Sequence, residues 1–137
     1  MIIYLVGMPG AGKSVVGREL AGRLGVPFVD LDAEIERTAG RRVTEIFAAD
    51  GEAAFRAVEA EALTKAGTQD PSVVACGGGV VLEAANRITL RATGVAVFLD
   101  VPVDQLRRRV RPASDRPLIH EDGDIERLLE QREPLYR

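Results

Sequence analysis

The stretch GMPGAGKS at residues 7–14 decides the fold of this chain. It matches the pattern G-x-x-x-x-G-K-[ST], a glycine-rich loop whose backbone N–H groups close around phosphate oxygens. The apolar run IIYLV at residues 2–6 precedes it and predicts a buried parallel strand. Apolar residues at helical spacing follow it, at Val16, Leu20 and Leu24. A strand, a phosphate loop and a helix in this order predict a nucleotide-binding site.

Two side chains of this loop carry the predicted chemistry. Lys13 offers a positive charge to the β- and γ-phosphates, and the Ser14 hydroxyl can bind Mg²⁺. The N-terminus of the helix that follows adds its dipole. The predicted ATP site therefore consists of Gly10, Ala11, Gly12, Lys13, Ser14 and Val15.

Outward from the loop, short apolar runs alternate with longer polar-periodic segments. Further strands are predicted at residues 27–30, 72–76 and 95–100. Helices are predicted at residues 33–38, 43–49, 52–66, 82–92, 103–110 and 124–132. Strands that alternate with helices predict a parallel sheet in an α/β fold. Ligands of such sheets bind at the carboxyl ends of the strands.

Length and composition limit the classes of protein to which this chain can belong. With 137 residues, 46% of them hydrophobic and 28% charged, the chain is predicted to be one globular domain over residues 1–137. A net charge of −3 argues against general nucleic-acid binding. Single copies of cysteine (Cys76) and histidine (His120) exclude an internal disulfide and a Cys/His zinc site within one chain. These features fit a reduced, cytoplasmic setting without membrane spans.

Two carboxylates follow the predicted second strand, at Asp30 and Asp32. In an extended chain, residues i and i+2 lie on one face, so both are expected to face the phosphate site. The third strand ends in glycines at residues 77–79 and offers no acid, so Asp30 is the candidate for the Mg²⁺ site, through water. Asp32 then faces the acceptor as a candidate base. Asp32 as the N-cap of the next helix is the alternative, and the two roles are compatible.

Six motifs together resemble one family, shikimate kinase, and the resemblance spans essentially the whole chain. A phosphate loop alone is shared by many functions, whereas the combination is far more specific. The motifs are the loop at 7–14, the pair Asp30-x-Asp32, GEAAFRAVE at 51–59, GGG at 77–79, RPL at 116–118 and REPLYR at 132–137.

The resemblance implies a three-layer P-loop NTPase of the nucleoside monophosphate kinase type. The implied reaction moves the γ-phosphoryl group of ATP, with Mg²⁺, to the 3-hydroxyl of shikimate. The product is shikimate 3-phosphate, in aromatic amino-acid (chorismate) biosynthesis. The resemblance also implies a monomer in the cytoplasm, without nucleic-acid or membrane partners.

The resemblance further implies a role for individual residues. Shikimate would be held in a helical segment at about residues 31–66 and by residues outside it. The implied catalytic residues are Lys13, Asp32 and Arg116. The implied shikimate-binding residues are Asp32, Arg56, Gly77, Gly78, Gly79 and Arg132, with Phe47 and Phe55 as walls and Glu59 holding Arg56. Two arginines suit a carboxylate because each guanidinium can bind it in a bidentate manner. For Phe47 and Phe55, a plain core role stays open.

An arginine-rich segment leads into the predicted loop at residues 111–123. One interpretation of this segment is a surface that binds nucleic acid. The simpler interpretation is that Arg107 and Arg108 lie on a solvent-exposed helix face. The resemblance implies a lid here that closes Arg116 onto the phosphates, with Arg109 near the adenine. Cys76 is expected to be a core residue, and His120 receives no role.

Members of the family usually continue beyond the REPLYR motif for a strand, a loop and a helix. If this chain ends at Arg137, the sheet lacks its last strand and one edge stays open. Two other functions stay under consideration. One is a kinase for another small hydroxylated acid, such as gluconate, or for a nucleotide, which a panel of acceptors would reveal. The other is a non-catalytic domain that binds ADP and transfers nothing.

Overall fold

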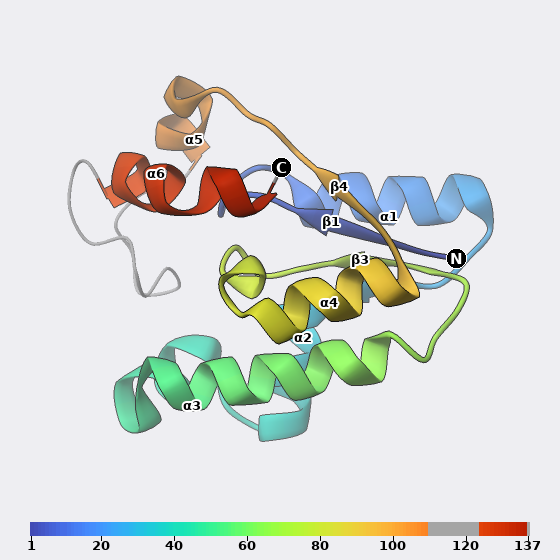
Figure 1. Cartoon of the computed structure of the whole chain (residues 1–137), viewed down its shortest axis with the longest axis horizontal. Helices are drawn as coiled ribbons and strands as arrows, with labels where there is room; N and C mark the ends of the chain where they lie inside the picture. The colour runs from blue at the N-terminus through green and yellow to red at the C-terminus, as the bar shows by residue number, and fades with distance from the viewer. Residues whose placement is uncertain (110–123, 137) are drawn as a thin grey trace.

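The structure is a computed structural model that describes residues 1–109 and 124–136. Within these residues, parallel strands form one sheet in the order β2-β3-β1-β4. The strands are β1 (Ile2–Val6), β2 (Phe28–Asp30), β3 (Ser72–Ala75) and β4 (Gly94–Phe98). The helices are α1 (Lys13–Leu24), α2 (Leu31–Ala39), α3 (Val43–Ala66), the 3-10 turn η1 (Val80–Leu82), α4 (Ala84–Thr93), α5 (Val103–Arg109) and α6 (Asp124–Tyr136). The expected parallel α/β fold is confirmed (Figure 1).

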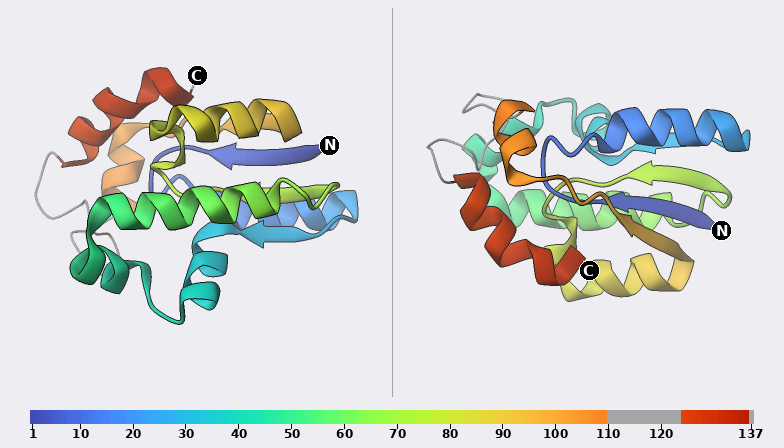
Figure 2. Two further views of the ribbon diagram at one scale, coloured as in Figure 1. Left: turned by 60° about the horizontal axis from the view of Figure 1, so that its bottom comes forward. Right: turned by 90° about the horizontal axis from the view of Figure 1, so that it is seen from above.

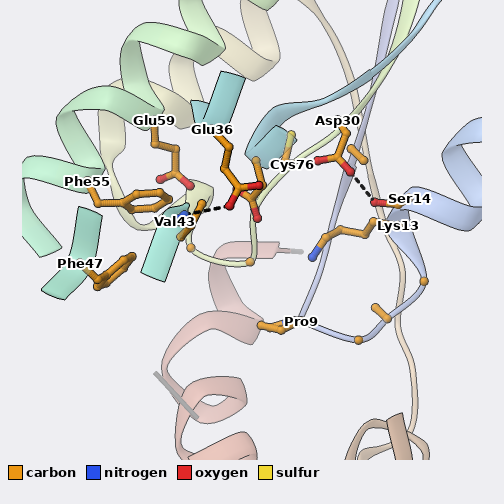
Figure 3. A pocket seen from close by; sticks show the side chains of 18 of the residues that line it. Pro9, Lys13, Ser14, Asp30, Glu36, Val43, Phe47, Phe55, Glu59 and Cys76 are labelled. Carbon is orange, nitrogen blue, oxygen red and sulfur yellow. Dashed lines mark hydrogen bonds between the residues drawn. The ribbon is translucent and has the colours of Figure 1, made fainter. Parts of the chain in front are cut away.

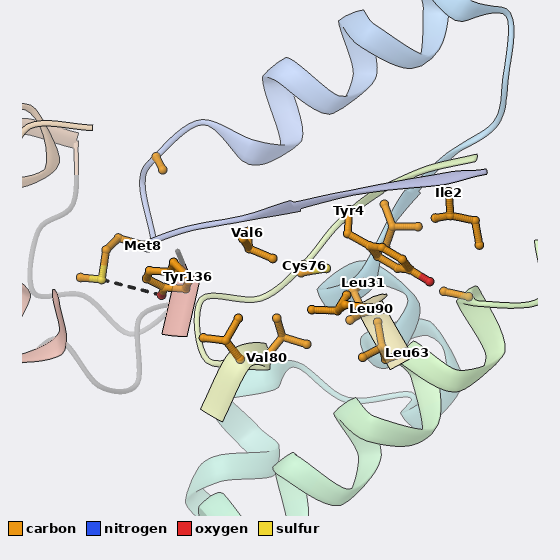
Figure 4. Close-up of a cluster of buried hydrophobic side chains, with 14 of the residues drawn as sticks. Ile2, Tyr4, Val6, Met8, Leu31, Leu63, Cys76, Val80, Leu90 and Tyr136 are labelled. Atoms are coloured by element: carbon orange, nitrogen blue, oxygen red, sulfur yellow. Dashed lines mark hydrogen bonds between the residues drawn. The ribbon is translucent and has the colours of Figure 1, made fainter. Parts of the chain in front are cut away.

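Helices cover both faces of the sheet and give the expected three layers (Figure 2). On one face, Leu5 of β1 packs with Ala21 of α1. On the other face, Tyr4 of β1 packs with Leu63 of α3 and Leu90 of α4 (Figure 4). Neighbouring residues of β1 point to opposite faces because side chains alternate along a strand. Both faces of this strand are therefore buried, as its continuous apolar run predicts.

The apolar spacing located α1 correctly, but of its three residues only Leu20 packs against the core, beside Leu5 and Ala21. The residues of α1 that are buried are Gly17 and Ala21. Val16 and Leu24, by contrast, are 42% and 52% exposed. A Cβ atom on Gly17 would lie 2.5 Å from Cε1 of Phe28. The bare backbone of Gly17 therefore lets α1 approach the sheet closely.

The helix after β2 begins earlier than predicted, and this corrects the capping hypothesis. Helix α2 starts at Leu31, and its N-cap is Asp30, whose side chain accepts a hydrogen bond from the Ala33 N–H at 3.2 Å. The hypothesis that Asp32 caps this helix is therefore wrong, because Asp32 lies inside its first turn. The extended-strand argument for the pair also fails, because the strand ends at Asp30.

The break predicted between helices at 43–49 and 52–66 is confirmed inside α3, where Gly51 has a φ of +89° and separates two helical parts. A left-handed conformation of this kind favours glycine. Residues Val80–Leu82 form the turn η1, so α4 starts only at Ala84. Helix α6 continues to Tyr136 and contains Pro134, which brings the end of the REPLYR motif into the helix.

Some predictions fall on residues outside the described ranges. The expected lid at 111–123, with Arg116 and His120, is among them, as is the side chain of Arg109. In the two ranges that the structure does describe, no helix has the length and apolarity to cross a membrane.

Candidate active site

A cavity of about 610 Å³ opens at the carboxyl ends of the strands (Figure 3). The phosphate loop, the start of α2, the helix α3, the glycine segment at 77–79 and the helix α6 contribute to its walls. All predicted site residues inside the described ranges line it, except Arg109, whose side chain is not described. They are Gly10, Ala11, Gly12, Lys13, Ser14, Val15, Asp30, Asp32, Phe47, Phe55, Arg56, Glu59, Gly77, Gly78, Gly79 and Arg132.

The phosphate loop is shaped by glycines in left-handed conformations. Gly10 and Gly12 have φ values of +85° and +93°, which residues with a Cβ atom rarely adopt. Lys13 begins α1, and its Nζ donates hydrogen bonds to the carbonyl oxygens of Gly7 at 2.6 Å and Met8 at 3.2 Å. The ammonium group is therefore held over the loop, on the side of the cavity.

Ser14 and Asp30 join the loop to the end of β2. The Ser14 hydroxyl donates to Oδ2 of Asp30 at 2.9 Å, while Oδ1 of Asp30 caps α2 (Figure 3). Among the described residues, no group of three or more His, Cys, Asp or Glu side chains could hold a metal ion. A hydroxyl and one carboxylate nevertheless fit Mg²⁺, which usually keeps several waters and binds substrate phosphates as well.

Arg56 and Glu59 form a buried ion pair on one face of α3. Nη1 of Arg56 lies 3.0 Å from Oε1 of Glu59, and Nη2 lies 3.3 Å from Oε2 of Glu52. The Arg56 guanidinium also lies over the ring of Phe55, with its central carbon 5.2 Å from the ring centroid. Burial raises the pKa of Glu59, and the charge of Arg56 opposes that shift. Glu59 therefore fixes Arg56, as the resemblance implies.

Two carboxylate oxygens in this region are buried and lack a hydrogen-bond partner in the described part of the chain. They are Oδ1 of Asp32 and Oε2 of Glu59. The pKa of Asp32 is raised, mainly by burial and then by the negative charge of Asp30. Buried polar atoms are rarely left without partners in folded proteins, so these oxygens mark a place where a polar ligand can bind.

The glycine segment lies against two guanidinium groups. A Cβ atom on Gly79 would lie 2.4 Å from Nη2 of Arg56, and one on Gly78 would lie 3.3 Å from Nη1 of Arg132. Arg132 belongs to α6, is 3% exposed, and its Nε has no hydrogen-bond partner in the described residues. The fold therefore brings two arginines from distant parts of the chain to one backbone segment that has no side chains.

Comparison with known proteins agrees with this arrangement. The family model for shikimate kinase matches residues 9–137. The chain belongs to the shikimate kinase family. The shikimate kinase of Paracidovorax citrulli is 45% identical, over 98% of this chain and 76% of its own length. That of Halorhodospira halophila is 48% identical, over 98% of this chain and 78% of its own length.

Solved shikimate kinases also share the fold. The structure of the Acinetobacter baumannii shikimate kinase in complex with shikimate superposes with a TM-score of 0.94 at 41% identity, and the match covers 99% of this chain and 78% of that one. The Aquifex aeolicus enzyme gives 0.88 at 34% identity, over 99% and 82%. The P-loop NTPase fold and the activity expected from the motifs, ATP-dependent phosphorylation of shikimate in aromatic biosynthesis, are therefore confirmed.

The two phenylalanines of this shikimate kinase family member serve the cavity and the core together. Their ring centroids lie 4.7 Å apart, and both rings line the cavity. Phe55 is buried in a cluster with Ile35 and Ile46, and Phe47 packs against that cluster. The two interpretations that the sequence left open are therefore compatible.

Cys76 is confirmed as a core residue. It is buried, and burial raises the pKa of its thiol to about 12. Although Cys76 also borders the cavity, its burial and raised pKa are those of a structural cysteine.

Glu36 is a cavity residue that the sequence analysis missed. Its Oε2 accepts a hydrogen bond from the backbone N–H of Val43 at 2.8 Å (Figure 3). Val43 is the first residue of α3, and the N-cap residue of that helix, Arg42, makes no capping hydrogen bond. Glu36 therefore caps α3 from another helix. No local pattern reveals this, because the capping box and the N-cap preference involve neighbours in sequence.

Proposed function

We propose that the phosphate loop holds ATP and that shikimate binds in the same cavity between α2, α3 and the glycine segment, within one domain. The two buried arginines carry this proposal. Arg56 and Arg132 meet at the glycine segment, and the Nε of Arg132 has no partner among the described residues. A carboxylate on a small ring is the group that two such guanidinium groups bind best, because each can form paired hydrogen bonds to it.

Asp32 is proposed as the base of the transfer. As the 3-hydroxyl oxygen of shikimate attacks the γ-phosphorus of ATP, its proton passes to Asp32, and the bond from the γ-phosphorus to the leaving oxygen of ADP breaks. Oδ1 of Asp32, buried and without a partner in the described residues, is free to accept that proton. The raised pKa of Asp32 makes it a stronger base than an exposed aspartate.

Charge in the transition state is proposed to be neutralised from the phosphate loop. The Lys13 ammonium would exchange its contacts with Gly7 and Met8 for phosphate oxygens. Mg²⁺, when bound by Ser14 and through water by Asp30, would shield the β- and γ-phosphates. The roles of Arg109 and Arg116 stay predictions, as do the monomeric state and the cytoplasmic location.

Calorimetric titration of shikimate tests the proposal. Arg56→Ala and Arg132→Ala should each weaken shikimate binding by roughly 10- to 150-fold, because each removes a charge-assisted hydrogen bond. ADP binding should stay unchanged. The matched control is Arg37→Ala, since Arg37 is exposed and pairs only with Glu34 in the described structure.

A shikimate analogue without the carboxylate makes the test specific. It should bind the wild type weakly and respond little to either arginine variant. If the analogue loses as much affinity as shikimate does, the arginines act on the fold, and their role in recognising a ring acid is withdrawn.

A further inference from the structure

Tyr136 connects three parts of the site from the end of α6. The residue is 5% exposed, and its ring stacks on Phe98 of β4, with ring centroids 5.1 Å apart. Its hydroxyl lies 3.9 Å from Sδ of Met8, at the start of the phosphate loop (Figure 4). Packing in the core therefore fixes the tyrosine ring independently of the hydrogen bonds of its hydroxyl.

The hydroxyl of Tyr136 makes one such hydrogen bond, toward the proposed shikimate side. It donates to the carbonyl oxygen of Gly78, which is 58 residues away in sequence. Nη1 of Arg132, one helical turn earlier in α6, would lie 3.3 Å from a Cβ atom on the same glycine. The Tyr136 hydroxyl thus holds the backbone segment against which Arg132 lies.

This connection matters because the glycine segment has no side chains of its own to hold it. Residues 77–79 are all glycine, and glycine loses more conformational freedom on folding than any other residue. The hydrogen bond from the Tyr136 phenol to Gly78 restricts the conformational freedom of this segment before the substrate binds, which favours binding.

We propose that Tyr136 is a positioning residue for shikimate, whose hydroxyl holds the backbone of Gly78, the glycine against which Arg132 lies, without touching the substrate. The inference rests on the proposed binding of shikimate at these residues. It assigns to Tyr136 no part in binding the nucleotide. The competing interpretation is that Tyr136 only fills the core.

The variant Tyr136→Phe separates these two interpretations because it keeps the ring and removes the hydroxyl. The chain offers a matched control in Tyr4→Phe. Tyr4 is also buried, and its hydroxyl forms a hydrogen bond of 2.6 Å with Oγ1 of Thr93. Tyr4 does not line the cavity. Both variants lose one buried hydroxyl, so a general loss of stability should appear in both.

Tyr136→Phe should weaken shikimate binding by about 3- to 10-fold, the range expected for one lost hydrogen bond. The KM for shikimate should rise by a similar factor, while the KM for ATP and the affinity for ADP stay within about twofold of wild type. Tyr4→Phe should lower the melting temperature and leave every one of these constants unchanged.

Two results would overturn the inference. One is unchanged shikimate affinity in Tyr136→Phe while the wild type binds shikimate normally. The other is an equal loss of shikimate and ADP affinity, or an equal loss in both tyrosine variants, which would show a core role only. If the wild type itself fails to bind shikimate, the proposed function fails instead, so the two failures are distinguishable.

Discussion

Oδ1 of Asp32 and Oε2 of Glu59 both lie 3.0 Å from the point where a Cβ atom on Gly77 would stand. The two carboxylates come from α2 and α3 and meet at a residue without a side chain. Burial is the main cause of the raised pKa of Glu59, and the charge of Asp32 adds to it. The bare backbone of Gly77 therefore leaves room for two buried carboxylates whose pKa values are both raised.

The first prediction concerns Asp32→Asn. We expect kcat to fall by about 10²- to 10⁴-fold because the base is lost. Stability should stay equal or rise near neutral pH, because burying a neutral amide costs less free energy than burying a carboxylate. The cap of α2 is unaffected, because Asp30 and not Asp32 provides it. Steady-state rates and thermal unfolding measure the two effects. A lower melting temperature with normal kcat would contradict the assignment.

The sign of the pH dependence follows from the raised pKa of Asp32. Between the ordinary aspartate pKa of 3.8 and the higher pKa in the folded chain, the folded state binds more protons than the unfolded state. The contribution of Asp32 to stability is therefore full below this window and falls as the pH rises through it. Asp32→Asn should remove that part of the pH dependence of the apo protein.

The second prediction is that Glu36→Gln shifts the acid limb of the profile of kcat/KM against pH. Asp30 and Glu36 raise the pKa of Asp32 by their charges, while Lys13 and Arg56 lower it. Removing the charge of Glu36 should move the limb of kcat/KM to lower pH, and glutamine can still accept the bond from Val43. Rates measured against pH test this. Glu34→Gln, on the same helix but paired with Arg37 at the surface, should leave the limb in place.

The third prediction uses glycine variants. A Cβ atom on Gly79 would lie 2.4–2.6 Å from three atoms of the Arg56 guanidinium, so Gly79→Ala must displace that group. We expect shikimate affinity to fall by at least about tenfold, in line with the loss of a charge-assisted hydrogen bond. ADP affinity should stay normal.

The control for this experiment is Gly22→Ala in α1. Nothing lies within 4 Å of a Cβ atom at Gly22, and alanine in a helix is favoured over glycine by about 1 kcal/mol. This variant should be neutral or stabilising and should bind shikimate normally. If Gly79→Ala behaves in the same way, the close approach of Arg56 to Gly79 has no importance for binding.

The fourth prediction separates the two roles of Asp30. Asp30→Ala removes the cap of α2 and should cost about 1 kcal/mol of stability. Asp30→Asn keeps a capping oxygen and should retain that stability. Both variants should need more Mg²⁺ for half-maximal rate, which titration of Mg²⁺ at fixed ATP measures. An unchanged Mg²⁺ requirement in both would remove Asp30 from the proposed metal site.

The sequence by itself determined the phosphate loop, the alternation of strands and helices, and the breaks at Gly25 and Gly51. Both glycines are in left-handed conformations, as their place at a helix end or interruption requires. These features depend on residues within one or two turns of each other, so a contiguous pattern is sufficient to predict them. The membership of Arg56, Asp32 and Arg132 in one site was predictable only through resemblance to a family.

The tertiary structure alone decided the rest. Asp30 caps α2 because the chain turns directly at the end of β2, which the alternation of apolar and polar residues does not encode. Glu36 caps α3 from another helix, and the buried face of α1 is set by the contact between Gly17 and Phe28. The hydrogen bond from Tyr136 to Gly78 joins residues far apart in the chain. Each of these depends on how elements pack, because side chains without sequence proximity meet only when the core brings them together.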